Sequence, residues 1–274
     1  MTKISVLTIT YRDISLLEQR VAELARQSFT EFEWVLVDDH YAEHKDLVAA
    51  WDTLFPIIHI PPRQIVPYGA ACAAVNSGLV YASGSLVHCM ADYVQLTKDV
   101  LTRHWELYER YGPKVMISGP LLPWECPECA RKKERPFALP DAAWVIQCHV
   151  CSEKMYTVQA RRHERTLPPL HTEGEITTGG LMAQTWFFGR NDSADLESLL
   201  AVNGMDERRD GPTGGMDSDL GTRLMNQGSR YIIDFLIPAF LHPHVREKTD
   251  SPEMVKRRYE ISLELDRQIE DGRV

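Results

Sequence analysis

The order of apolar and polar residues divides the first part of the chain into short strands and helices. Apolar, β-branched runs predict strands over residues 4–9, 32–37, 57–60 and 85–90. Apolar residues at helical spacing follow the first of these runs, and a second helical pattern covers residues 70–82. Strands that alternate with helices require crossover connections, so the pattern predicts an α/β fold with a mostly parallel sheet flanked by helices.

A change of composition interrupts this pattern after residue 117. Residues 118–170 contain seven prolines, two cysteine pairs and basic clusters, which indicates a small insert rather than more sheet. The elements expected after it are a strand over 181–188, a helix over 216–226 and a strand over 231–237. The chain therefore divides into residues 1–117, the insert, residues 171–249 and a charged C-terminal helix in residues 250–274.

Composition and charge exclude several classes of protein. The chain has 274 residues, of which 44% are hydrophobic and 25% charged, so it can bury a sizeable core and is not disordered. No run reaches about 18 apolar residues and no basic leader opens the chain, so we expect a cytoplasmic protein without a membrane span. Thirty basic and 39 acidic residues give a net charge of −9, which argues against non-specific binding of nucleic acid.

Four of the six cysteines form two C-x-x-C pairs, Cys126 with Cys129 and Cys148 with Cys151. The 18 residues between the pairs are typical of a zinc site, in which each turn presents two thiolates to one tetrahedral ion. Four sulfur ligands close the coordination sphere, so we expect a structural Zn²⁺ that folds the insert. Redox chemistry or a chance pairing is the alternative.

Five sequence pieces follow one another along the chain. They are TITYRD, VLVDDH, GAACAAVNSGLVYASGSLVHCMADY, VNGMDER and GGMDSDLGTRL. Taken together they resemble the family 2 glycosyltransferases, which use nucleotide sugars and have the GT-A fold. The resemblance covers most of the chain outside the insert and the C-terminal segment. It implies a GT-A type sheet with a nucleotide-sugar-binding half in residues 1–117, an acceptor-binding half in residues 171–249, and a hexosyltransferase-like activity.

The resemblance also implies a donor site at the carboxyl ends of the strands. Its expected residues are Thr8, Thr10, Tyr11, Asp38, Asp39, Asn76 and Asp92. In the family the aspartate pair contacts the base and ribose of the donor, usually UDP, and a carboxylate accepts hydrogen bonds from such groups. Taken alone, the pair also fits a helix N-cap or a solvated strand end, and Asn76 fits a buried helix with one polar residue. Arg12 is either part of this edge or a surface charge.

Asp92 stands where the family has its metal-binding carboxylates. Its neighbours are Ala91 and Tyr93, so at most one carboxylate remains for a Mn²⁺ or Mg²⁺ ion on the donor diphosphate. A late metal-binding histidine of the family implies His242 or His244 as a further ligand, with a structural histidine as the alternative. Metal dependence is therefore left open by the sequence.

Asp217 matches the catalytic base of the family, with Met216 in place of an acidic residue. A direct displacement needs a carboxylate beside the acceptor hydroxyl to take its proton as the new bond forms. Asp219 is expected to cap the helix or to pair with Arg223. The alternative for both aspartates is the common use of Asp in the first turn of a helix.

We therefore expect an inverting glycosyltransferase that moves a sugar from a nucleotide diphosphate donor, UDP-linked, to the hydroxyl of a carbohydrate or other acceptor. One alternative is that the insert binds DNA and that the acceptor is a hydroxylated base, which the weak net charge of the insert disfavours. The other alternative is a non-catalytic protein that binds a nucleotide sugar. The lack of carboxylates at positions 91 and 93 is the evidence for it.

Overall fold

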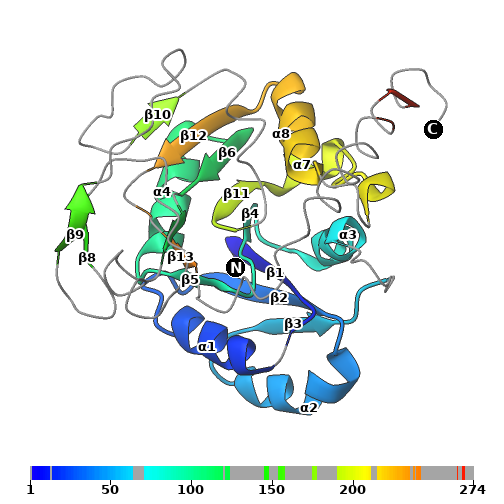
Figure 1. Ribbon diagram of the computed structural model, residues 1–274, viewed down its shortest axis with the longest axis vertical. Coiled ribbons are helices and arrows are strands. Elements are labelled where there is room, and N and C mark those ends of the chain that lie inside the picture. The colour runs from blue at the N-terminus through cyan, green and yellow to red at the C-terminus, as the bar shows by residue number, and fades with distance from the viewer. Residues whose placement is uncertain are drawn as a thin grey trace.

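An eight-stranded sheet forms the centre of the computed structural model (Figure 1). The described residues are 2–12, 14–63, 71–119, 121–123, 145–147, 154–157, 175–177, 190–210, 215–234, 237, 239–241, 264 and 267–268. In spatial order the strands are β10 (Glu175–Thr177), β12 (Arg230–Asp234), β6 (Val115–Ser118), β11 (Asp192–Asp195), β4 (Leu86–Cys89), β1 (Ile4–Thr10), β2 (Phe32–Asp38) and β3 (Ile57–Ile60).

Most neighbouring strands in one half of this sheet run in the same direction. β3, β2, β1 and β4 are parallel, whereas β11 is antiparallel to both β4 and β6. β12 is parallel to β6, and β10 is antiparallel to β12. The predicted α/β fold with a mostly parallel sheet is therefore confirmed, and segments from both sides of the insert contribute strands to the one sheet.

Two smaller sheets accompany the main one. β5 (Val94–Leu96), β13 (Ala239–Leu241) and β7 (Leu121–Pro123) form a three-stranded sheet, with β13 in the middle. β8 (Val145–Gln147) pairs with β9 (Lys154–Thr157) in an antiparallel ladder. These last two strands belong to the predicted insert, whose four cysteines lie outside the described residues.

Helices cover both faces of the main sheet. One face packs on α1 (Ile14–Leu24), α2 (Tyr41–Trp51) and α4 (Val100–Tyr111). The other face packs on α3 (Ala71–Tyr81), α7 (Leu196–Ala201) and α8 (Met216–Asn226). Alternation along β1 explains the two layers, because Ile4 and Val6 enter the first core and Leu7 enters the second. None of the helices in the described ranges has the length and apolar character that crossing a bilayer requires.

Candidate functional site

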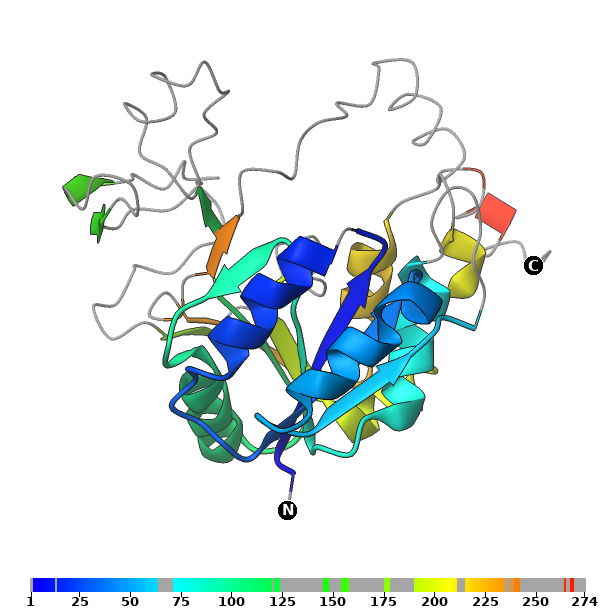
Figure 2. The same ribbon diagram turned by 90° about the horizontal axis from the view of Figure 1, so that it is seen from below.

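The strand order creates a switch point between β1 and β4. From β1 the chain moves to β2 and β3 on one side, then returns through α3 to β4 on the other side. In Figure 2, β1 runs away from the N-terminal label, so its carboxyl end lies at the opposite edge of the sheet. Open α/β sheets bind ligands at this edge, beside the point where the strand order reverses. Of the predicted donor residues, Tyr11, Asp39 and Asp92 follow β1, β2 and β4 at this edge, whereas Asn76 lies on α3.

Thr10 joins the ends of these three strands. Its carbonyl oxygen accepts a hydrogen bond of 3.0 Å from the Asp39 N–H, and its hydroxyl donates one of 2.7 Å to Asp92 Oδ2. Asp92 is 1% exposed, and its other oxygen accepts a hydrogen bond of 2.5 Å from Arg12 Nη1. The structure therefore links Thr10 to both Asp39 and Asp92, and it makes Arg12 a partner of Asp92.

Tyr11 and Thr8 occupy opposite environments at the end of β1. The Tyr11 side chain is 63% exposed, and its hydroxyl accepts a hydrogen bond of 2.7 Å from Arg12 Nη2. Thr8 is fully buried, where its hydroxyl oxygen accepts a hydrogen bond of 2.9 Å from Trp34 Nε1. The exposed Tyr11 ring can thus contact a ligand. Thr8 instead holds β1 to β2 through its hydrogen bond with Trp34.

Asp38 and Asp39 differ sharply, although they are adjacent. Asp38 is buried, and its Oδ2 lies 2.8 Å from His44 Nδ1 and 3.1 Å from His59 Nε2. Its Oδ1 accepts a hydrogen bond of 2.8 Å from the His40 N–H. Burial alone raises the pKa of Asp38, but the hydrogen bonds from both imidazoles and from the N–H outweigh it and hold the pKa below its usual value.

The Asp39 side chain is half-buried and accepts no hydrogen bond from the described residues. Burial and the neighbouring charge of Asp38 raise the pKa of Asp39. A carboxylate with unshared acceptor sites at this edge is suited to N–H or hydroxyl donors of a ligand. Of the predicted pair, Asp39 is therefore the residue whose carboxylate can accept hydrogen bonds from a ligand. Asp38 instead anchors α2 and β3 beside it.

The segment around Asn76 and Gly78 holds α3 in place on the sheet. A Cβ atom at Gly78 would lie 2.2 Å from Leu7 Cδ1, so glycine permits the close approach of helix and sheet. On the same helix, Asn76 Nδ2 donates to the Met205 carbonyl at 2.8 Å, and Asn76 Oδ1 accepts from the Met205 N–H at 2.8 Å. Asn76 thus binds the loop after α7, and its predicted part in holding the nucleotide stays a prediction.

Asp210 is a residue of this region that the sequence did not single out. Its carboxylate accepts hydrogen bonds of 2.7 and 3.0 Å from the backbone N–H groups of Cys72 and Ala73, at the start of α3. It therefore caps the helix from a distance of more than a hundred residues along the chain. Its position before a glycine-rich segment was the only hint of a special role in the sequence. The sequence does not show that it binds the N–H groups of Cys72 and Ala73.

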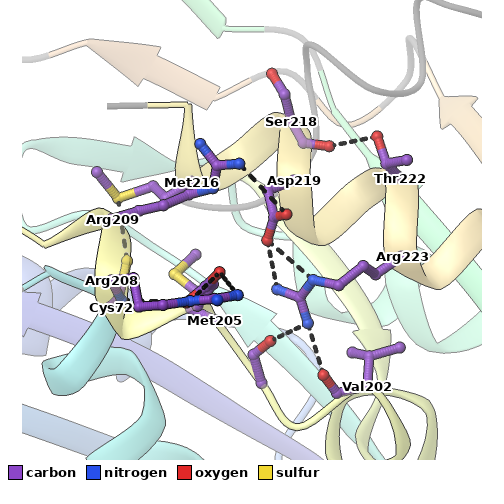
Figure 3. Close-up of polar contacts among 12 residues, drawn as sticks. Cys72, Val202, Met205, Arg208, Arg209, Met216, Ser218, Asp219, Thr222 and Arg223 are labelled. Carbon is purple, nitrogen blue, oxygen red and sulfur yellow. Dashed lines mark hydrogen bonds and ion pairs between the residues drawn. The ribbon is translucent and has the colours of Figure 1, made fainter. Parts of the chain in front are cut away.

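Arg223 on α8 connects that helix to the loop after α7 (Figure 3). It binds Asp219 Oδ2 through Nε at 2.9 Å and Nη2 at 2.6 Å, which confirms the predicted pairing. Its Nη1 donates to the carbonyl oxygens of Val202 and Gly204 at 2.6 and 2.8 Å. Asp219 also lies 3.7 Å from Arg209. Asp219 is thus neutralised by two arginines and serves the packing of α8.

Asp217 differs from Asp219, although both lie in the first turn of α8. Part of its surface is exposed while protein surrounds the rest, and it accepts no hydrogen bond from the described residues. Desolvation by the surrounding protein raises the pKa of Asp217 to about 7, and the charge of Asp192 adds to this, while Arg190 lowers it. The charge of Asp217 also acts on the thiol of Cys89, the last residue of β4, which connects this carboxyl group to the edge that holds Asp92.

Asp192 is a second carboxyl group of this edge that the sequence did not reveal. It opens β11 opposite Cys89 of β4 and Ser118 of β6. It is buried, and it accepts hydrogen bonds from the Ser118 hydroxyl and from the Arg190 N–H. Burial raises the pKa of Asp192 to about 6 despite these bonds. A buried acid beside Asp217 is the kind of neighbour that tunes a functional carboxyl group.

A surface cavity of about 930 Å³ lies elsewhere, between α3, the end of β3 and residues 200–208. Arg63, Asn76, Tyr81 and Arg208 are among its lining residues, whereas the carboxyl groups described above are not. The candidate site is therefore defined by the strand ends and not by this cavity. The predicted zinc ligands Cys126, Cys129, Cys148 and Cys151, and the predicted histidines His242 and His244, lie outside the described residues.

Comparisons with known proteins support the fold. No protein-family model matches the chain, and no curated protein matches it. Among solved structures, TarS of S. aureus aligns with a TM-score of 0.62 at 14% identity, over 98% of this chain and 40% of TarS. A shorter TarS structure in complex with UDP-GlcNAc has a TM-score of 0.62 at 14% identity, over 95% of this chain and 64% of that one.

A mannosyltransferase from Pyrobaculum calidifontis, PcManGT, in complex with GDP-Man and Mn²⁺, aligns with a TM-score of 0.57 at 14% identity. The alignment covers 96% of this chain and 69% of the mannosyltransferase. The chain spans less than two thirds of the length of the TarS structures. These alignments confirm the predicted GT-A type fold.

Proposed function

We propose that this protein is an inverting glycosyltransferase, which moves a sugar from a nucleotide diphosphate donor to an acceptor hydroxyl. The acceptor oxygen attacks the anomeric carbon and forms the new glycosidic bond. The bond between that carbon and the diphosphate breaks, and the nucleoside diphosphate leaves with the electron pair. The hydroxyl proton passes to a protein carboxylate on the opposite face, so the anomeric configuration inverts.

The observation that carries this proposal is a pair of carboxyl groups without partners among the described residues, one just after β2 and one in the first turn of α8. Asp39 and Asp217 accept no hydrogen bonds from the described residues, whereas Asp38, Asp192 and Asp219 are occupied by protein partners. Two separate free carboxylates are what a transferase of this kind requires, one for the donor nucleoside and one for the acceptor proton. The fold adds support, since TarS and PcManGT were solved with UDP-GlcNAc and GDP-Man respectively.

We assign the role of base to Asp217. A general base works best when its pKa lies near the working pH, because it is then ionised and still binds a proton well. The raised pKa of about 7 meets this condition. Asp219, two residues further along α8, is held by Arg223 and Arg209 and is therefore a poor proton acceptor.

We assign donor binding to Tyr11, Asp39 and the residues around Asp92. The exposed Tyr11 ring provides a face for the base, and Asp39 provides an acceptor for a base N–H or a ribose hydroxyl. We propose a UDP-linked donor. GDP-linked donors belong in the same screen, because a carboxylate also accepts the N–H groups of guanine.

The insert completes the proposal on the acceptor side. We propose that its four cysteines bind one structural Zn²⁺, and that the acceptor is a carbohydrate or other hydroxyl compound. Elemental analysis of the purified protein tests the metal, and about one zinc per chain is expected for a closed four-thiolate site. Retardation of duplex DNA at low salt would instead favour a DNA acceptor.

The decisive test combines donor binding with turnover. Thermal-shift screening against UDP- and GDP-sugars identifies the donor, and release of the nucleoside diphosphate then measures turnover. Asp217→Asn should lose at least about a hundredfold in kcat, as expected for the loss of a general base, and should keep its affinity for the donor. Asp46→Asn, at an exposed position of α2, is the matched control and should behave as wild type. Equal turnover of Asp217→Asn and wild type would refute the assignment.

A further inference from the structure

The fold family implies a divalent cation at Asp92, and the described residues around this carboxylate do not fit one. Both its oxygens already accept hydrogen bonds, Oδ2 from Thr10 and Oδ1 from Arg12. Its neighbours Ala91 and Tyr93 supply no second carboxylate. Within the described ranges, no three His, Cys, Asp or Glu side chains gather into a group that could hold a metal ion. Mg²⁺ is usually held by one or two carboxylates together with substrate phosphates and waters, and here the single carboxylate is already paired with Arg12.

The charges around Asp92 also disfavour a second cation. Arg12 lies 2.5 Å from its Oδ1, and the charge of the buried Arg20 acts on the same carboxylate. Arg20 is fixed there by a salt bridge of 2.8 Å to Glu23 and by a hydrogen bond to the Val94 carbonyl. A divalent ion at this point would approach two guanidinium groups and gain a single carboxylate that is already paired. Like-charge repulsion from Arg12 would therefore oppose a cation beside this buried carboxylate.

Arg12 itself is held as a ligand-binding guanidinium would be. Its Cζ lies 4.4 Å from the centre of the Tyr11 ring and 5.0 Å from that of Tyr93, and its Nη2 donates to the Tyr11 hydroxyl at 2.7 Å. The side chain is nevertheless 22% exposed. A guanidinium has five N–H donors and a permanent charge, and only two hydrogen bonds from this side chain are formed to described residues. The remaining donors can face a ligand.

We infer that Arg12, oriented by Asp92, binds the diphosphate of the donor in place of a divalent cation, so that donor binding and sugar transfer need no metal. The inference rests on the proposed function. Arg12 lies two residues after the end of β1, beside the switch point where a diphosphate would lie. Charge-assisted hydrogen bonds from a guanidinium to phosphate oxygens are strong, and they stabilise the charge that develops on a leaving diphosphate.

Calorimetric titration of the full chain with UDP, GDP and the parent nucleosides tests the inference, in EDTA and in excess Mn²⁺. Wild type should bind a nucleoside diphosphate equally well in both, and should release it from the sugar nucleotide at the same rate in both. Arg12→Gln should lose about tenfold to a hundredfold in affinity for the diphosphate in EDTA, as for a charged hydrogen-bonding group, and keep its affinity for the nucleoside. Arg12→Lys should lose less affinity for the diphosphate than Arg12→Gln. Arg26→Gln, at an exposed position just after α1, is the matched control and should bind as wild type does.

The outcomes separate the inference from the proposed function. A wild-type protein that binds or turns over the donor only with Mn²⁺ would overturn the role of Arg12 and leave the glycosyltransferase proposal intact. The same holds if Arg12→Gln binds the diphosphate as wild type does. Failure of wild type to bind any nucleoside diphosphate, with or without Mn²⁺, would remove both. The wild-type comparison uses no variant, so it remains informative even if Arg12→Gln does not fold.

Discussion

The raised pKa of Asp217 makes a direct prediction about the dependence of turnover on pH. A base acts only in its ionised form, so the protonated carboxyl group present below its pKa is inactive. With a pKa of about 7 instead of the ordinary 3.8, kcat/KM should rise with pH at unit slope and level off above neutrality. About one tenth of the molecules would carry the ionised base one pH unit below the pKa, and about one hundredth two units below.

Two substitutions should move this rise in opposite directions. The negative charge of Asp192 opposes ionisation of Asp217, so Asp192→Asn should lower the pKa of Asp217 and shift the rise towards lower pH. Arg190 favours ionisation, so Arg190→Gln should shift the rise towards higher pH. The thiols of Cys72 and Cys89 lie within the field of Asp217, but burial raises their pKa values and keeps both neutral throughout this range.

Two measurements check the prediction independently. The carboxyl ¹³C shift of Asp217, assigned from its loss in Asp217→Asn, reports the ionisation without any substrate. The pH profile of kcat/KM for nucleoside diphosphate release reports the group that controls turnover. A carboxyl group that titrates near pH 4, or a shift in the same direction for Asp192→Asn and Arg190→Gln, would refute the electrostatic reasoning. Circular dichroism melts ensure that all variants compared are folded.

Three further predictions concern stability and are measured by urea unfolding. Asp210→Ala should lower the free energy of unfolding by about 1–2 kcal/mol, because two N–H groups at the start of α3 lose their cap; an unchanged value would mean that water replaces it fully. Gly78→Ala should also lower the free energy of unfolding. Alanine gains about 1 kcal/mol in helix propensity, but its Cβ overlaps Leu7, and overpacking costs about 1–3 kcal/mol. Arg223→Met should cost about 2 kcal/mol, because Asp219 and two carbonyl groups lose charged donors; a smaller loss than for Asp210→Ala would contradict this.

Apolar patterns predicted the strands β1 to β4 and the helices α1, α3 and α8 well. The run over residues 57–60 is β3, and the helix over 216–226 is α8 with the same limits. The strand predicted over 4–9 extends one residue further, and the last strand, predicted over 231–237, is β12 at 230–234. These elements bury one apolar face or two, so their period is visible in the sequence itself. α2, α4 and β6 were not predicted, although α4 is amphipathic and ends at Gly112.

β11 shows why part of a sheet escapes such patterns. Its sequence is DSAD, with three polar residues, and yet it lies between β4 and β6 in the middle of the sheet. Its polar side chains are buried against distant partners: Ser193 Oγ lies 2.6 Å from His104 Nδ1, and Asp195 accepts a hydrogen bond of 3.0 Å from the Tyr108 hydroxyl. Burial of a polar group is favourable only with such partners, and a strand prediction from local sequence does not contain them.

The same limit applies to the aspartates of the site. Asp38 and Asp39 are adjacent, so spacing alone assigns them one common role, and they separate only through distant partners such as His59 on β3 for Asp38. The helical spacing of Asp219 and Arg223 already distinguishes Asp219 from Asp217, but the second partner, Arg209, is visible only in the structure. An aspartate whose oxygens are occupied stabilises the fold, and the neighbour that has no partner among the described residues keeps the acceptor sites that chemistry requires. Substitution to asparagine should therefore affect ligand binding or turnover more at Asp39 and Asp217, and unfolding more at Asp38 and Asp219.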